Sequence, residues 1–152
     1  MSHADLDARE RLLDALADAS DELARALASL GAAYEQLDEQ QADRLEEQLF
    51  RPVQRAYGRA KRTHAEFAGR YGLSAREFTM PTPGAPSTGV RGFIQSALDA
   101  VERAELELVA LQDSEIAIEV GDPELRSGLT EVRQLLDGLS QRARTFVRSF
   151  GR

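Results

Sequence analysis

Cysteine and tryptophan are both missing from this sequence of 152 residues, and each absence narrows what the protein can be. Without cysteine the chain has no disulfide, no thiolate metal ligand and no thiol nucleophile. Other aromatic residues are few, with three tyrosines and six phenylalanines. A hydrophobic core must therefore be built mainly from leucine, alanine and valine.

Long apolar runs are also missing. No stretch approaches the roughly 20 residues that a membrane-spanning helix needs, and the first residues, Met1 to Asp5, lack the basic and then apolar pattern of a signal peptide. We therefore expect a cytoplasmic protein with no membrane partner.

Lysine is almost absent, since Lys61 is the only lysine among 19 basic residues. This bias towards arginine is typical of a GC-rich gene, and we expect a bacterial source. The net charge of −7 favours solubility and makes nucleic acid an unlikely partner.

Apolar residues recur at intervals of three and four through the first part of the chain, interrupted only by Ser20. This spacing is typical of the heptad seam of coiled coils and bundles, and it predicts a helix over residues 4–37. The seam consists of Leu13, Leu16, Ser20, Leu23, Leu27, Leu30, Tyr34 and Leu37.

A change in the apolar phase follows Leu37. Asp38 stands three residues before Gln41, which is the pattern of a helix cap and its partner. We predict a sharp turn at residues 37–39, with one long helix containing a stutter as the alternative. The second helix should cover residues 39–71.

Proline and glycine mark the later boundaries. Pro52 should kink the second helix, and Gly72 should end it. The segment 74–89 is rich in helix breakers and should be a loop, with Phe78 and Met80 packing on the end of the bundle.

Two further helices are predicted, over residues 88–120 and 123–150. The first stops at Gly121. Asp122 followed by Pro123 is a strong helix start, because aspartate caps the first turn and proline suits the first helical position.

Four amphipathic helices joined by two short turns and one longer loop predict an all-α, four-helix antiparallel bundle, forming a single domain over residues 1–152. A helix of ~34 residues is about 50 Å long, and sixteen extended residues reach about 50 Å. A ferritin-like crossover thus requires a fully stretched loop, and a helical turn from Ser74 to Phe78 would make it too short. The up-down-up-down path is preferred, with the crossover as alternative.

The sequence contains few of the motifs that indicate a metal site or a catalytic nucleophile. Ferritin-type di-iron sites use Glu-x-x-His motifs, whereas this chain has only His3 and His64, with Lys61 three residues before the latter. Motifs of nucleophilic catalysis and phosphate binding are also missing. We expect no catalytic residues, no metal site and no cofactor.

Four residues remain as candidates for binding a small ligand. Tyr57, His64 and Glu102 would matter if they lined a cavity, although His64 on an apolar stripe is more simply a histidine of the core edge. Glu115 occupies a seam position, where a carboxylate needs a partner. In the up-down-up-down path that partner is Arg44, and ligand binding is the other interpretation.

A basic stripe on the second helix consists of Arg51, Arg55, Arg59 and Arg62. It could bind an acidic partner, but solvent and the acidic start of the first helix are its expected surroundings.

The leading hypothesis is a non-enzymatic protein-interaction or structural module, acting on a protein partner or as a homodimer. Surplus apolar positions could form its contact face, namely Leu6, Phe50, Phe78 and Met80. A small-ligand-binding bundle and a ferritin-like protein with carboxylate metal ligands are the alternatives.

Overall fold

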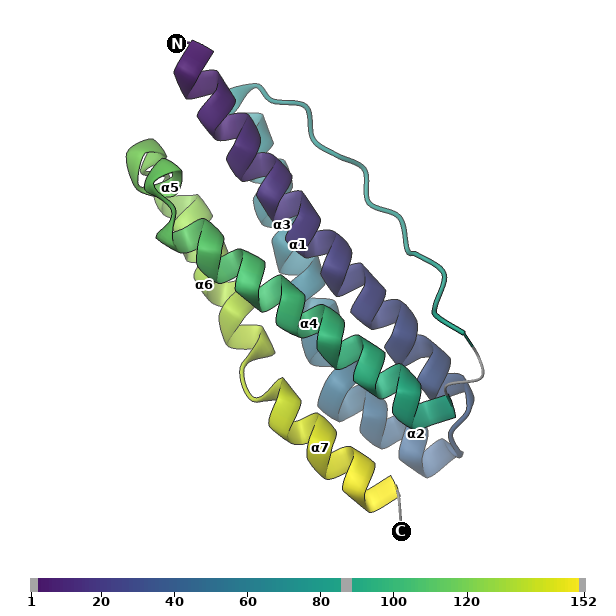
Figure 1. The fold of residues 1–152 in the computed structure, drawn as a ribbon. Coiled ribbons are helices and arrows are strands. Elements are labelled where there is room, and N and C mark those ends of the chain that lie inside the picture. The colour runs from purple at the N-terminus through teal and green to yellow at the C-terminus, as the bar shows by residue number, and fades with distance from the viewer. Residues whose placement is uncertain (1–2, 86–88, 151–152) are drawn as a thin grey trace.

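The computed structural model describes residues 3–85 and 89–150, and every regular element in them is a helix. The protein is therefore all-α, as predicted. The count of four helices is not confirmed, because the described residues form seven α-helices and one π-helical turn, several of them following one another end to end (Figure 1).

The first predicted turn is confirmed. Helix α1 covers His3–Glu35 and α2 covers Glu39–Leu45. Between them, Asp38 accepts a hydrogen bond at 2.8 Å from the backbone N–H of Gln41, so the cap anticipated from this pair is present.

The disturbance expected at Pro52 takes the form of a π-helical turn, η1, over Glu46–Phe50, ahead of α3 over Arg51–Tyr71. Proline has no N–H to donate to the carbonyl four residues earlier, that of Gln48. This carbonyl instead accepts a hydrogen bond at 3.1 Å from Arg142 Nε. Gly72 then ends α3 in the left-handed conformation, as predicted (φ 66°).

Both later helices are interrupted where continuous helices were predicted. Helix α4 covers Gly89–Asp113 and α5 covers Glu115–Val120. Ser114 separates them, because its hydroxyl accepts a hydrogen bond at 3.1 Å from the backbone N–H of Ala117 and caps a new helix.

Asp122 caps the next helix, as predicted, and α6 covers Pro123–Leu136. This helix ends before Gly138, whose φ of 74° favours glycine. A separate helix, α7, then covers Leu139–Phe150. The prediction of one helix over 123–150 is therefore wrong at this point.

The up-down-up-down path is wrong. Arg103 of α4 pairs with Glu22 of α1, while Leu111 lies beside Leu12, so α4 runs antiparallel to α1. Arg9 of α1 lies over the ring of Tyr71 of α3, so α3 is antiparallel to α1 as well. Helices α3 and α4 thus point the same way.

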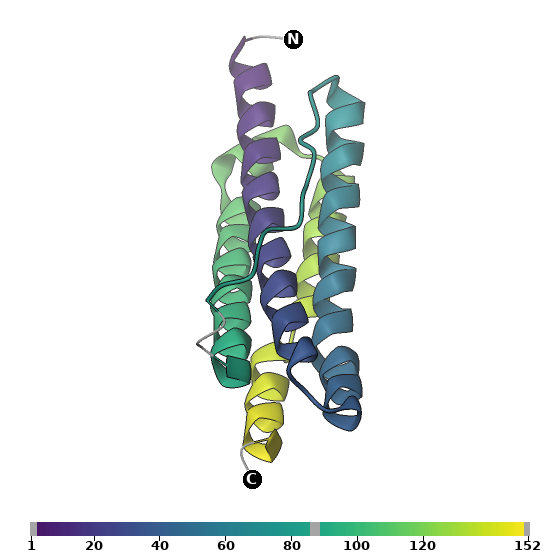
Figure 2. The same ribbon diagram turned by 90° about the vertical axis from the view of Figure 1, so that its right-hand side faces the viewer.

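A crossover must connect two helices that point the same way, and the segment after α3 runs along the length of the molecule (Figures 1 and 2). Its residues 73–85 contain no helical turn. The turn considered for Ser74–Phe78 does not form, so the segment stays extended and is long enough.

The prediction that Phe78 and Met80 of this segment pack on the end of the bundle is wrong. Phe78 lies against the side of α3, at ring contacts with Tyr57 and His64. Met80 is 54% exposed. Arg76 holds the segment to α1, at 3.4 Å from Asp18 and 3.0 Å from Asp21.

Leucine, alanine and a few aromatic rings form the core between α1, α3, α4 and α6. Close helix approach explains the small residues, since a methyl group added at Gly128 of α6 would lie 2.3 Å from Thr63 Oγ1 of α3. The largest fully buried side chains include Phe67, Phe146, Leu16, Leu23, Leu45, Leu49 and Ile94.

Candidate interaction groove

Two of the four predicted ligand residues, Tyr57 and His64, lie together on α3. The Phe78 ring packs edge-on against both, at centroid distances of 6.5 Å from Tyr57 and 5.0 Å from His64. Lys61 Nζ lies 4.3 Å from the centroid of the Tyr57 ring. His64 is only 1% exposed, so a ligand would have to displace Phe78 to reach it.

Burial also controls the protonation of these two side chains. Desolvation and the nearby Arg76 lower the pKa of His64, outweighing the opposite influence of Asp14 and Asp21. Desolvation and Asp21 raise the pKa of Tyr57. Both groups therefore favour their uncharged forms, as suits an aromatic cluster packed under the crossover.

Glu102 and Glu115 do not join this cluster. Both are exposed, Glu102 on α4 and Glu115 in the first turn of α5. The expected pair between Glu115 and Arg44 is wrong, because the crossover places them at opposite ends of the molecule (Figure 1). Arg44 Nη2 instead donates to Ser149 Oγ at 3.3 Å.

An ionic network around the buried carboxylate of Asp122 joins the end of α3 to the start of α6. Asp122 is 5% exposed and accepts from Arg70 at 3.0 and 2.6 Å, from the Tyr71 hydroxyl at 2.6 Å and from the Leu125 N–H at 2.8 Å. Burial alone would raise the pKa of Asp122, but the bonds from Arg70 and Tyr71 outweigh it and lower that pKa. Four donors on one carboxylate fix the register between α3 and α6.

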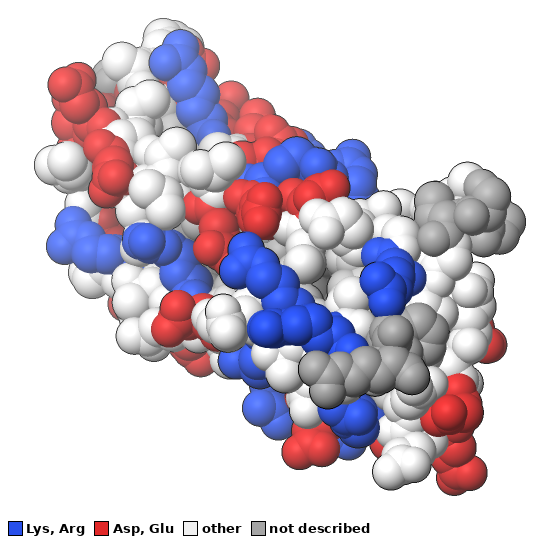
Figure 3. Space-filling model, turned by 60° about the horizontal axis from the view of Figure 1, so that its bottom comes forward, with Lys and Arg blue, Asp and Glu red and all other residues white. Residues whose placement is uncertain are grey.

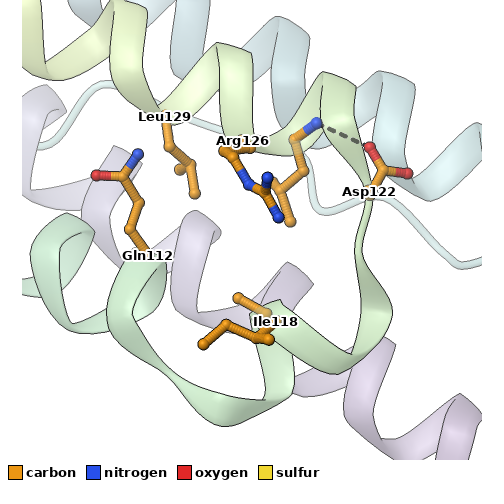
Figure 4. Close-up of a pocket in the computed structure, with 7 residues that line it drawn as sticks. Gln112, Ile118, Asp122, Arg126 and Leu129 are labelled. Atoms are coloured by element: carbon orange, nitrogen blue, oxygen red, sulfur yellow. Dashed lines mark hydrogen bonds between the residues drawn. The ribbon is translucent and has the colours of Figure 1, made fainter.

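Beside this network, α4, α5 and α6 enclose a cavity of about 140 Å³ (Figure 4). Gln112, Ile118, Arg126 and Leu129 line it together with Asp122. The carboxylate of Asp122 is already committed to the network, and the volume is below the roughly 300 Å³ at which small-molecule pockets begin.

A larger hollow of about 690 Å³ lies between the first half of α4 and α7. We call it the α4–α7 groove. Ile94 and Ala143 are buried at its base, while Leu98 and Val147 are half-buried in its walls. Its remaining lining residues are Arg91, Gly92, Gln95, Arg144 and Arg148.

The groove lies where α7 follows the break at Gly138. Arg142 of α7 donates to the carbonyl of Gln48 in η1 at 3.1 Å and to that of Asp137, in the turn just before α7, at 3.3 Å. Helices α1 and α4 pack along their length, whereas α4 and α7 touch only slightly.

The rim of the groove is basic. Arg91, Arg144 and Arg148 are exposed, and within the described ranges none of them forms an ion pair. Figure 3, which brings this end forward, shows basic side chains gathered in a band across it. Asp99, which follows Leu98 on α4, accepts a hydrogen bond from Gln95 Nε2 at 2.9 Å.

The predicted basic stripe on α3 differs from the rim in that three of its four members meet acids, whereas Arg55 forms no ion pair within the described residues. Arg59 Nε lies 2.6 Å from Glu131 of α6, Arg62 lies 4.0 Å from Glu66, and Arg51 lies 4.0 Å from Glu46. The first of these acids comes from α6 rather than from the acidic start of α1.

Sequence reasoning missed the groove, although a signal was present. Leu98 and Val147 stand beside the apolar seams of their helices, as surplus apolar positions. The predicted contact face used other surplus apolar residues. Two of these, Leu6 and Phe50, lie near opposite ends of α1 and so do not form one face.

The described residues were also compared with the requirements of a metal site and of a membrane-spanning helix, and the chain with known proteins. In residues 3–85 and 89–150 no group of three or more His, Asp or Glu side chains is arranged to hold a metal ion. Nor does any helix of that part of the chain have the length and apolar character to cross a membrane. Comparison with protein-family models, curated proteins and solved structures found no match.

Proposed function

We propose that this chain is a non-enzymatic protein-interaction module that binds a protein partner in the α4–α7 groove. The observation that carries the proposal is the half-buried pair Leu98 and Val147, which line the α4 and α7 sides of an open hollow of about 690 Å³. Apolar surface left in such a hollow is stabilised when a second surface covers it.

The chemistry of the lining favours binding over catalysis. Arginine stays protonated and cannot exchange a proton with a substrate at neutral pH, and the other lining residues are glutamine, glycine and apolar side chains. A helix-lined apolar hollow is a typical receptor for a helix from another protein.

We further propose that the helices are best regarded as a four-helix bundle with one crossover. Its members are α1, the run α2–η1–α3, α4 with α5, and α6 with α7. In this arrangement the break between α6 and α7 is the feature that opens the groove, so the architecture and the proposed function share one cause.

Site-specific photo-crosslinking tests the proposal. A photoreactive phenylalanine derivative replaces Val147 in the groove, and the matched control places it at Leu106, which is 71% exposed on the same α4 that forms the other wall. In cells of the source organism, we expect a discrete heavier species from position 147 and none from position 106. The same species at both positions, or none at 147, would contradict the proposal.

A further inference from the structure

We propose that the occupant of the α4–α7 groove is an acidic amphipathic helix of a partner protein, an inference that rests on the proposed function. The juxtaposition behind it is an apolar slot between two helices, with Arg91 on the α4 side and Arg144 and Arg148 on the α7 side. The shape of the groove and the charge of its rim are two separate arguments for this occupant.

The apolar residues follow the repeat of a helix on both walls. Ile94 and Leu98 are four residues apart on α4, and Ala143 and Val147 are four apart on α7. Each pair is therefore separated by about 6 Å along its helix axis. An incoming helix with apolar residues at positions 1, 4 or 5, and 8 presents the same spacing.

Room for a close approach comes from the small residues Gly92 and Ala143 in the lining. Helix α7 has 12 residues, which makes it about 18 Å long. That length corresponds to about three turns of a bound helix.

Charge then selects among amphipathic helices. Arg91 stands on the α4 side, and Arg144 and Arg148 stand one turn apart on α7. Elsewhere Arg59 pairs with Glu131 and Arg103 pairs with Glu22. Arg133 and Arg142 donate to uncharged oxygens instead. The three rim arginines have no carboxylate partner in the described residues. Three cations without such partners favour glutamate or aspartate on the flanks of the occupant and disfavour lysine.

The apolar base argues for a protein helix rather than a nucleic acid. Nucleic acids are bound through phosphates and stacked bases. Among the described side chains that line the groove none is aromatic, and half-buried Leu98 and Val147 offer nothing that a phosphate backbone needs.

Three labelled peptides of about 15 residues, a length that permits a helix, test the inference by fluorescence anisotropy with the full-length protein. The first carries leucines on one face and glutamates on its flanks. The second has lysine in place of each glutamate. The third keeps the glutamates and replaces the leucines with serine.

Two sets of variants test the contributions of charge and apolar contact. The double variant Arg144→Glu with Arg148→Glu reverses the rim, and Arg55→Glu on exposed α3 surface is its control. Leu98→Gln and, as a milder change, Val147→Thr make the walls polar. Circular dichroism checks that each variant retains its helices.

We expect the first peptide to bind at least about tenfold more tightly than either of the others near 50 mM salt, with the advantage over the lysine peptide shrinking at higher salt. The double variant should reverse the order of the first two peptides, whereas Arg55→Glu should leave it unchanged. Leu98→Gln and Val147→Thr should weaken binding of the first peptide.

Equal binding of the first and third peptides would overturn the inference, because charge alone would then suffice, as for a polyanion. Equal binding of the first two, or no binding of either, would also overturn it. A dimer in sedimentation that Leu98→Gln dissociates would overturn it in favour of a second copy. If crosslinking at Val147 succeeds while the peptides fail, the proposed function stands and only the acidic helix is rejected.

Discussion

Where α3 ends and α6 begins, a buried carboxylate is bound by an arginine and a tyrosine, whereas around the α4–α7 groove charged side chains stand in solvent beside half-buried apolar residues. Asp122 has four donors within 3.0 Å. Arg144 and Arg148 have no carboxylate partner in the residues that the structure describes. Both regions are rich in arginine, so composition alone does not separate them.

The difference lies in whether the charges are used within the fold. A buried carboxylate with every partner in place sets the position of two helices, and its removal leaves cations and donors unsatisfied. Exposed, unpaired cations contribute little to folding. The first region should therefore govern stability, and the groove should tolerate change and be available to a partner.

The largest effect should come from Asp122→Ala. This change removes the cap of α6, both bonds from Arg70 and the bond from Tyr71. We expect the free energy of unfolding, measured in urea, to fall by about 2–4 kcal/mol, from the lost cap and the lost charge-assisted hydrogen bonds. A loss below about 1 kcal/mol would mean that the network is dispensable.

A second effect should come from Gly128→Ala, at the contact of α6 with α3. The new methyl group would lie 2.3 Å from Thr63 Oγ1 and 2.6 Å from Thr63 Cγ2. Overpacking of this kind should lower the free energy of unfolding by about 1–3 kcal/mol, measured by urea denaturation.

Gly31→Ala is the matched control, because nothing lies within 4 Å of its added methyl group. There the better helix propensity of alanine should stabilise the protein, by up to about 1 kcal/mol. Adding Thr63→Ala to Gly128→Ala should relieve part of the clash, so the double variant should be more stable than the sum of the two single changes predicts. Strict additivity would argue against a direct clash.

Local signals explain which parts of the fold could be predicted from the sequence. Asp38 and Asp122 cap helices through bonds to residues three positions away, so the sequence pattern contains the whole interaction. Gly72 and Gly121 adopt positive φ for the same local reason. The pair Asp137–Gly138 is also a local turn signal, but the apolar seam continues past it and favours an unbroken helix.

The path of the chain and the groove depend on distant contacts, and these could not be predicted. The crossover is held by Arg76 on α1 and by Phe78 on α3. Helix α7 is joined to η1 by Arg142, which donates to the carbonyl that Pro52 leaves free, 94 residues away in sequence. Leu98 and Val147 were recognisable as surplus apolar residues, but not as partners across one groove.

A smaller effect concerns pH and the charge of Asp122. The folded pKa of Asp122 is lowered, while an unfolded aspartate titrates near 3.9. The stabilisation from its ionised form is therefore present above pH ~4 and is lost as the pH falls through the folded pKa. Asp122→Asn keeps an oxygen for the cap but not the charge, and should cost about 1–2 kcal/mol at neutral pH.

Urea denaturation of both proteins from pH 7 down to pH 3 checks this expectation. The gap between wild type and Asp122→Asn should narrow below pH ~4. A gap that stays constant across this range would show that hydrogen-bond geometry, rather than charge, accounts for the loss.

The smallest effect should come from the groove, in the double variant Arg144→Ala with Arg148→Ala. Two opposing changes are expected. Arg148 is the basic residue in the last turn of α7 and interacts favourably with the helix dipole, whereas arginines four residues apart repel each other. The free energy of unfolding in urea should therefore stay within about 0.5 kcal/mol of wild type. A loss comparable to that of Asp122→Ala would mean that these arginines support the fold, and the distinction between a structural region and a binding region would fail.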